Sequence, residues 1–152
     1  MRLIDADVLM EKIWREEVDT REKIADIIKN VPTFTSYDLD AERAVIGAMM
    51  LDAEAIKEAI QYLVPDDFYD RRYGEIYLAI KQLYKEGKPV DQLTLQDRLK
   101  SNGAPPEIVS VDYLRDLLLC VPISANVPYY VNIVYRKAMF REEMRRAMLK
   151  NQ

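Results

Sequence analysis

The stretch from Val64 to Leu99 constrains the fold most, because it carries its own start and stop signals for helices. Pro65 cannot continue a preceding helix, and Asp66, Asp67 and Asp70 can each accept a hydrogen bond from the free amides that open the next helix. The residues that follow recur at three- and four-residue steps, which predicts a helix with one apolar face. That face consists of Tyr73, Ile76, Tyr77, Ile80, Leu83 and Tyr84.

The end of this helix is marked as clearly as its start. Gly87 follows the last periodic residue and can adopt a left-handed cap without steric cost, and Pro89 opposes resumption of the same helix. A second helix is expected from Val90 to Leu99, with Asp91 or Thr94 as its cap. We also expect Phe68 and Tyr69, with Ile76, Tyr77 and Ile80, to be core residues.

The rest of the chain reads as all-α. It has 4 glycines in 152 residues, and no segment alternates apolar and polar residues as a strand would. Apolar residues at helical spacing follow Asp40, Asp52 and Ser110, with Leu51 and Tyr113 among those expected to face inward. The fold expected is a compact multi-helix bundle followed by a long C-terminal helix.

Residues 1–36 read as a separate helical leader, and residues 37–152 as the main domain. Asp5 or Asp7 caps a first short helix of the leader, and Asp19 or Thr20 a second. A hairpin of two short helices cannot bury both of its faces alone, so we expect it to dock on the main domain or on another copy. Asp5 and Asp7 also suggest a Mg²⁺-dependent nuclease, but no parallel-sheet pattern follows to bring further acids to them, and capping is the stronger explanation.

The final segment, residues 126–152, is predicted to be one helix with a narrow apolar stripe. Six basic residues from Arg136 onward stand against Glu142 and Glu143, so this end carries a charge of +4 and the remaining chain −8. A thin stripe flanked by arginine is typical of a helix that pairs with a partner helix. The candidate partner interface is Tyr130, Val134, Lys137, Phe140, Arg141, Met144, Arg145 and Met148.

Several functional classes are disfavoured by composition. Histidine is absent and Cys120 is the one cysteine, which opposes a zinc site, and no phosphate-binding glycine loop, dinucleotide fingerprint or nucleophile elbow is present. Asp66, Asp67 and Asp70 could be drawn as a cation site, but helix capping explains them better. We therefore expect no catalytic residues, no metal and no cofactor.

The net charge of −4 opposes general attraction to nucleic acid. The basic end has aromatic neighbours, but these have the helical spacing of packing residues, so direct nucleic-acid binding is expected to be weak or absent. No apolar run is long enough to span a membrane and no signal peptide is evident, so a cytoplasmic protein is expected.

Four segments together resemble the N-terminal domain of the DnaB-type replicative DNA helicases. They are DLDAERAVIGAMMLDAEAI, VPDDFYD, GKPVDQLTL and VPISANVPYYVNIVYRKAMFR, in the order that the family shows. The resemblance covers about Asp38 to Arg146 and implies a helical bundle followed by a long helical hairpin, of which 126–152 is the first arm. It further implies a hexameric collar that organises the helicase ring and docks primase, while a separate ATPase domain performs the unwinding.

The chain departs from that family pattern in identifiable places. It contains no ATPase domain and no second arm of the hairpin, residues 1–35 are not part of the usual domain, and Tyr73 stands where the family often has histidine. ATP-dependent helicase activity is therefore not expected of this chain.

Two hypotheses follow from the sequence. The first is a non-catalytic interaction and oligomerisation domain of the replication machinery, whose partners are further copies of itself and a replicative helicase or primase. The second is a phage or mobile-element accessory protein that binds and modulates the host replicative helicase, with the leader as its docking element.

Overall fold

The computed structural model describes residues 35–119 and 126–149, and every regular element in these two ranges is helical. This confirms the all-α prediction. The predicted leader helices with Asp5 and Asp7, and Cys120, lie outside the described residues. The described residues fall into two compact units, one of residues 39–135 and a smaller one that contains 35–38 and 136–149.

Helices α3 (Leu39–Leu51) and α4 (Ala53–Tyr62) open the larger unit and pack against each other. They are separated at Asp52, whose Oδ1 accepts a hydrogen bond from the Glu54 amide at 3.0 Å, as the capping pattern predicts. Most of α3 is buried, including Val45, but Leu51 is exposed, so its predicted inward position is wrong. Leu51 is the last residue of α3, where the chain turns at Asp52.

The chain then makes a tight turn, the 64–70 turn, built around the 3₁₀ helix η1 (Pro65–Asp67). Asp67 Oδ2 accepts from the Val64 amide at 2.9 Å. The buried carboxylate of Glu42, on α3, accepts from the amides of Tyr69 at 3.0 Å and Asp70 at 3.1 Å. The turn is therefore fixed by two carboxylates that bind its backbone.

The side chains in this turn correct one prediction. Phe68 is buried as expected, but Tyr69 is 50% exposed and is not a core residue. Phe68 has extended backbone angles, and successive side chains of extended chain point to opposite sides, so only one of the two neighbours can face the core. Tyr69 instead contributes its backbone amide, which donates to the buried Glu42 carboxylate.

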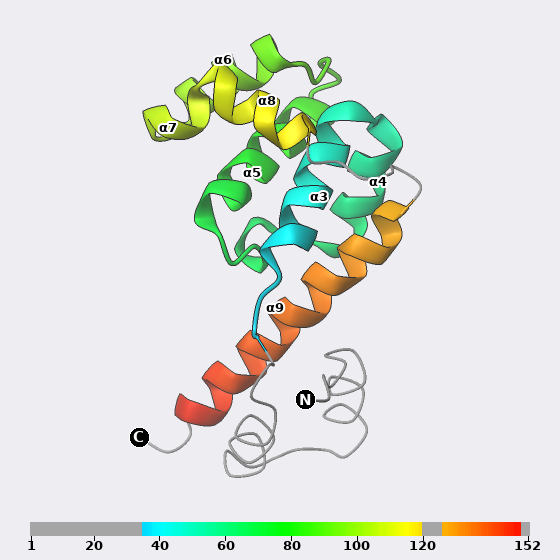
Figure 1. Cartoon of the computed structure of the whole chain (residues 1–152), viewed down its shortest axis with the longest axis vertical. Coiled ribbons are helices and arrows are strands. Elements are labelled where there is room, and N and C mark those ends of the chain that lie inside the picture. The colour runs from blue at the N-terminus through cyan, green and yellow to red at the C-terminus, as the bar shows by residue number, and fades with distance from the viewer. Residues whose placement is uncertain (1–34, 120–125, 150–152) are drawn as a thin grey trace. The chain divides into compact units, whose positions relative to one another are not determined.

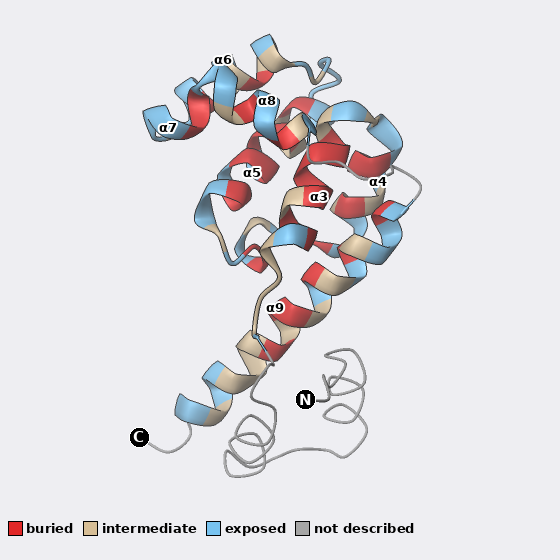
Figure 2. Cartoon of the chain, viewed as in Figure 1, coloured by how far each residue is buried: buried red, intermediate tan, exposed pale blue. Residues whose placement is uncertain are grey.

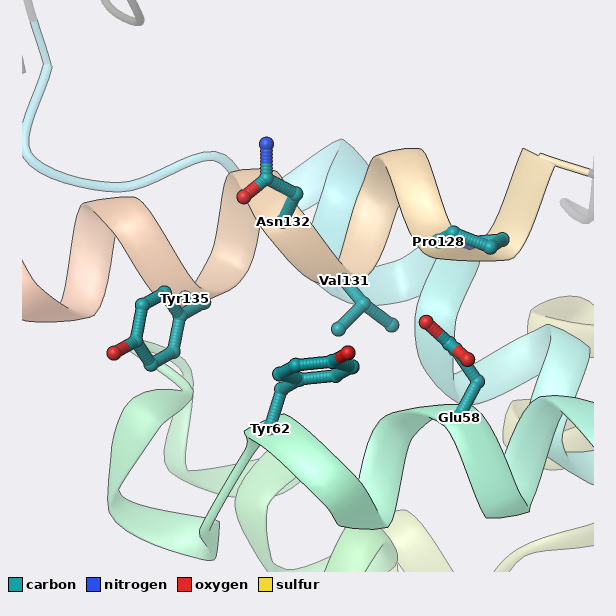
Figure 3. A pocket seen from close by; sticks show the side chains of 6 residues that line it. All are labelled: Glu58, Tyr62, Pro128, Val131, Asn132 and Tyr135. Atoms are coloured by element: carbon teal, nitrogen blue, oxygen red, sulfur yellow. The ribbon is translucent and has the colours of Figure 1, made fainter. Parts of the chain in front are cut away.

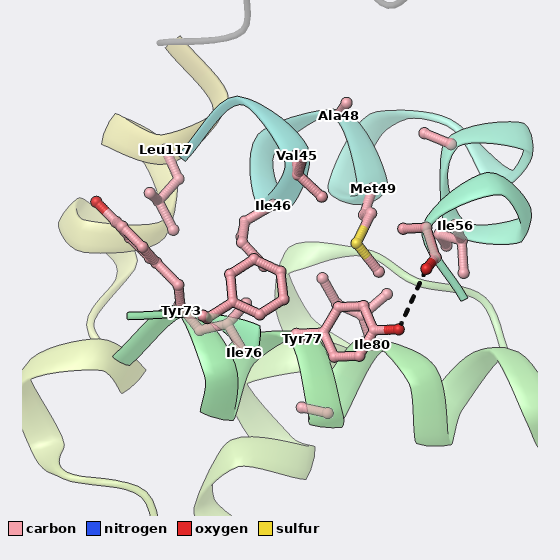
Figure 4. Close-up of a cluster of buried hydrophobic side chains, with 14 of the residues drawn as sticks. Val45, Ile46, Ala48, Met49, Ile56, Tyr73, Ile76, Tyr77, Ile80 and Leu117 are labelled. Atoms are coloured by element: carbon pink, nitrogen blue, oxygen red, sulfur yellow. Dashed lines mark hydrogen bonds between the residues drawn. The ribbon is translucent and has the colours of Figure 1, made fainter. Parts of the chain in front are cut away.

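Helix α5 (Arg71–Lys85) follows and supplies the centre of the core. Asp70 caps it, with Oδ1 accepting from the Arg72 amide at 2.9 Å. The hydroxyl of buried Tyr77 donates to the carbonyl of Leu63 at 2.6 Å, and burial raises the pKa of this phenol to about 12. Figure 4 shows Tyr77 beside Ile80 among the apolar side chains of the core.

A glycine fits α5 against the 64–70 turn. A Cβ at Gly74 would lie 2.8 Å from the carbonyl oxygen of Pro65, closer than any side chain tolerates, so the helix and the turn approach each other here because residue 74 has none.

Gly87 ends α5 with φ +71°, and the amides of Gly87 and Lys88 donate to the carbonyls of Tyr84 and Leu83. These two bonds make a Schellman motif, which confirms the predicted stop. Tyr84, predicted to face inward, is 38% exposed, because it lies in this last turn of the helix.

Three shorter helices follow α5 in the larger unit: α6 (Gln92–Ser101), α7 (Pro106–Val109) and α8 (Val111–Leu119). Asp91 caps α6 and shares reciprocal hydrogen bonds with Thr94, at 2.8 and 3.0 Å, so both predicted capping residues act together. Pro105 precedes α7, which begins at Pro106 because proline is tolerated at the first helical position. Ser110 Oγ accepts a hydrogen bond from the Tyr113 amide at the start of α8.

Helix α9 (Val127–Leu149) contributes its first nine residues to the larger unit and the remainder to the smaller one. In the larger unit, α3 packs against α4, α5 and α8 (Figure 1), and the buried faces of these helices meet in one core (Figure 2). The largest fully buried side chains of that core are Ile46, Met49, Leu63, Ile76, Tyr77, Ile80, Leu95, Leu99, Ile108 and Leu114.

Candidate protein-interaction surfaces

The first turns of α9 have one buried and one open side. Val127, Val131 and Val134 are spaced by four and three residues and belong to the core of the larger unit. Pro128 and Tyr129 are exposed on the same turns, and the Tyr129 ring packs edge-on against Tyr130 at 5.5 Å between centroids. No residue from 126 to 135 is charged. This part of α9 offers apolar and aromatic surface.

Two basic side chains farther along α9 bind backbone. Lys137 Nζ donates to the carbonyl oxygen of Thr35 at 2.6 Å, and Arg141 Nη1 donates to that of Ser36 at 2.8 Å. Lys137 is buried. Both cations thus contribute to the smaller unit itself, by satisfying carbonyls of the segment that precedes α3.

The last turns of α9 carry an exposed charge cluster. Glu142 accepts hydrogen bonds from Arg145 at 2.5 Å and from Arg146 at 3.3 Å. The Arg145 guanidinium lowers the pKa of the Glu142 carboxyl, and Glu142 in turn raises the pKa of Arg145. Arg145 and Arg146 share the Glu142 carboxylate, and with the neighbouring Glu143 the charges of residues 142–146 sum to zero.

The eight residues of the predicted interface therefore differ in accessibility. Three are buried, three are partly buried and two are exposed, so they do not form one continuous open stripe. The buried ones are Val134, Lys137 and Phe140, the partly buried ones are Tyr130, Arg141 and Met144, and the exposed ones are Arg145 and Met148.

A second surface, which the sequence did not indicate, is a pocket of about 410 Å³ between α4 and the first turns of α9. In Figure 3 the Glu58 carboxylate and Pro128 lie at one end and Tyr135 at the other, with Tyr62 and Val131 between them. Asn132 also lines it. The one sequence feature that could have suggested part of this pocket is the four-residue spacing of Glu58 and Tyr62, which places both side chains on one face of α4.

Two of the three aspartates considered for a cation site, Asp67 and Asp70, bind backbone amides instead, and Asp66 is exposed. Asp67 binds the Val64 amide, and Asp70 binds the Arg72 amide and the Arg72 guanidinium, with Nη2 at 2.7 Å from Oδ2. The hydrogen bond from Arg72 lowers the pKa of Asp70 despite partial burial. Arg72 also reaches Glu107 on α7 at 2.9 Å, so it links α5 to α7.

Within residues 35–119 and 126–149, no cluster of three or more acidic, histidine or cysteine side chains could hold a metal ion. In the same ranges, no helix has the length and apolar character needed to cross a membrane.

Comparison with known proteins identifies the family to which this chain belongs. The family model described as the DnaB-like helicase N-terminal domain matches residues 35–136. The replicative DNA helicase DnaC of Bacillus subtilis is 37% identical over 110 residues, and DnaB of Geobacillus stearothermophilus is 38% identical over 109 residues. Each alignment covers 72% of this chain, which spans 24% of the length of either relative.

Solved structures agree with the sequence match. The N-terminal domain of DnaB helicase from Mycobacterium tuberculosis is 39% identical, with a TM-score of 0.66 over 69% of this chain and 75% of that one. The N-terminal domain of DnaB helicase from Helicobacter pylori, described with its interactions with primase, is 21% identical, with a TM-score of 0.64 over 74% of this chain and 87% of that one. The second similarity shows the fold alone.

Proposed function

Because the chain belongs to the DnaB-like helicase N-terminal domain family, we propose that it is a cytoplasmic, non-catalytic interaction domain of the replication machinery. It acts through contacts with further copies of itself and with a replicative helicase or primase, as a collar domain that organises the ring. The match over residues 35–136 carries this proposal. The chain corresponds to about a quarter of the curated helicases, so their unwinding activity is not assigned to it.

The exposed basic end of α9 supports a role in assembly. Arg145 and Arg146 are both 64% exposed in their side chains, so their guanidinium groups are accessible to a partner. Met148, one turn beyond, is also exposed. Arginine beside methionine is the composition that protein interfaces favour.

The test is the molar mass of the purified chain by light scattering, with and without a replicative helicase such as the B. subtilis relative, or its primase. We expect self-association or a stable complex. Charge reversal with Arg141→Glu and Arg145→Glu should reduce that association, whereas Arg115→Glu, at an exposed position of α8, is the control and should not.

Because Arg141 also binds the Ser36 carbonyl, thermal unfolding of the double variant should be followed in parallel. Reduced association with a nearly unchanged melting temperature supports the proposal. A strictly monomeric chain that binds neither protein contradicts it.

A second candidate is an accessory protein that binds and modulates a host replicative helicase. The observation that favours it is that the family match begins at residue 35, which leaves the preceding 34 residues unmatched. Deletion of residues 1–34 distinguishes the two roles in a pull-down with the helicase. Loss of the helicase on deletion supports the accessory role, and retention supports the collar role.

A further inference from the structure

We propose that the pocket between α4 and α9 binds an arginine side chain presented by a cationic segment of a partner protein. The pocket lies within the larger unit and is lined by Glu58, Tyr62, Pro128, Val131, Asn132 and Tyr135. None of these is among the residues that α9 contributes to the basic end. The proposal therefore concerns a different surface from the one proposed for assembly and does not depend on it.

The polar groups of the pocket are not used inside the described fold. Among the residues that the structure describes, the Glu58 carboxylate takes part in no ion pair or hydrogen bond, and the same holds for the Asn132 amide and for the hydroxyls of Tyr62 and Tyr135. Tyr62 is 54% exposed and Tyr135 is 39% exposed, so both rings are accessible. The site thus offers one acceptor-only carboxylate beside open aromatic surface.

Charge selects the kind of occupant. Glu58 and the exposed Glu54 lie one turn apart on α4, while residues 126–135 carry no charge. Lys57 is the basic residue of α4 and does not line the pocket. The local charge is therefore negative, which favours a cation and opposes phosphate or nucleic acid.

Geometry favours arginine among the biological cations. A guanidinium is planar, so it can stack on a tyrosine ring while its edge donates two parallel hydrogen bonds to a carboxylate. Tyr62 and Glu58 are four residues apart on one face of α4 and both line the pocket, next to the apolar surface of Val131 and Pro128. That surface would cover the aliphatic stem of the arginine.

The experiment is a titration of the full chain, labelled with ¹⁵N, followed by nuclear magnetic resonance. The probe is the capped peptide acetyl-Gly-Ala-Arg-Ala-Gly-amide, compared with versions in which citrulline or lysine replaces arginine. We expect saturable shifts at the Asn132 side-chain amide and at the backbone amides of Tyr62 and Tyr135. Binding of the citrulline peptide, which keeps the shape and loses the charge, should be at least about tenfold weaker.

Two variants locate the site. Glu58→Gln should weaken binding of the arginine peptide by about tenfold and remove most of its salt dependence, while Glu75→Gln, at an exposed position of α5, should leave both unchanged. The folded state of Glu58→Gln is checked by its amide spectrum without peptide.

Four outcomes would overturn the proposal. Equal binding of the arginine and citrulline peptides would show an apolar site, and equal weakening by the two variants would show a general charge effect. Stronger perturbation by a single-stranded oligothymidylate would assign the pocket to nucleic acid. The same shifts on raising the protein concentration alone would make a second copy the occupant.

Discussion

Carboxylate and aromatic side chains occur both at the 64–70 turn and in the pocket between α4 and α9, but they act differently in the two places. At the turn, Asp67 and the Glu42 carboxylate of α3 accept hydrogen bonds from backbone amides, and just before the turn the Leu63 carbonyl accepts one from the Tyr77 hydroxyl of α5. In the pocket, Glu58 and Tyr62 have no such partner among the described residues. Similar composition therefore serves folding in one place and is left for binding in the other, and hydrogen bonding distinguishes the two.

The largest contrast should come from removing one carboxylate from each region. Glu42→Ala should lower the free energy of unfolding by about 3 kcal/mol, because the amides of Tyr69 and Asp70 lose charge-assisted acceptors. Glu58→Ala should change it by less than about 0.5 kcal/mol. Urea unfolding of the two variants measures the difference, and equal losses would contradict the comparison.

Next in size is the contact between α5 and the turn. Gly74→Ala should lower the free energy of unfolding by about 2 kcal/mol, because the added Cβ meets the Pro65 carbonyl oxygen and outweighs the better helix propensity of alanine. Thermal unfolding monitored by circular dichroism measures this loss. A gain near 1 kcal/mol, which alanine normally gives in a helix, would mean that the turn moves freely away.

A smaller effect is expected from the phenols. Tyr77→Phe leaves the buried carbonyl of Leu63 without its hydroxyl donor and should cost about 1 kcal/mol. Tyr62→Phe, in the pocket, is the matched control and should be nearly neutral. Urea unfolding of both variants tests this, and a loss at Tyr62 as large as at Tyr77 would show that the pocket hydroxyl is used in folding.

The smallest effect is the pH dependence at Asp70. Its pKa is lowered in the folded state by Arg72, so its charge stabilises the fold above its ordinary pKa of 3.8, and this contribution disappears as the pH falls through the lowered value. Asp70→Asn keeps a good helix cap and should cost less than about 1 kcal/mol at pH 7, since Arg72 is partly exposed.

The difference between wild type and Asp70→Asn should therefore shrink as the pH approaches 3. Unfolding by urea at several pH values measures it. A difference that stays constant with pH would show that the charge of Asp70 contributes nothing.

The helix boundaries were largely predictable because their causes are local. Asp52, Asp70, Asp91 and Gly87 each act on backbone groups within a few residues, and each does so where the sequence placed it. Whether a given side chain points toward the core or toward solvent was less predictable. Tyr69 and Tyr84 have the spacing or neighbours of core residues, but the extended backbone of the turn and the end of α5 leave them partly exposed.

The interactions that the sequence did not reveal join distant segments. Glu42 binds amides 27 and 28 residues away, and Lys137 binds a carbonyl 102 residues away, so neither partner can be identified from local spacing. The pocket likewise combines α4 with α9. For the predicted interface, the sequence identified the apolar and basic residues of α9, but it could not separate Val134, in the core, from Arg145, at the surface.

The glycine that ends α5 has a consequence for handedness. Gly87 has φ +71°, and a Cβ built there meets no other atom within 4 Å, so the strain of any L residue comes from chirality and not from crowding. A D-alanine has the opposite preference and fits this φ. Chemical synthesis of the chain with D-alanine at position 87 should thus stabilise it by about 0.4–1 kcal/mol, by restricting the unfolded chain alone. At position 87, the backbone conformation of this L-protein therefore suits a D-amino acid better than an L-amino acid.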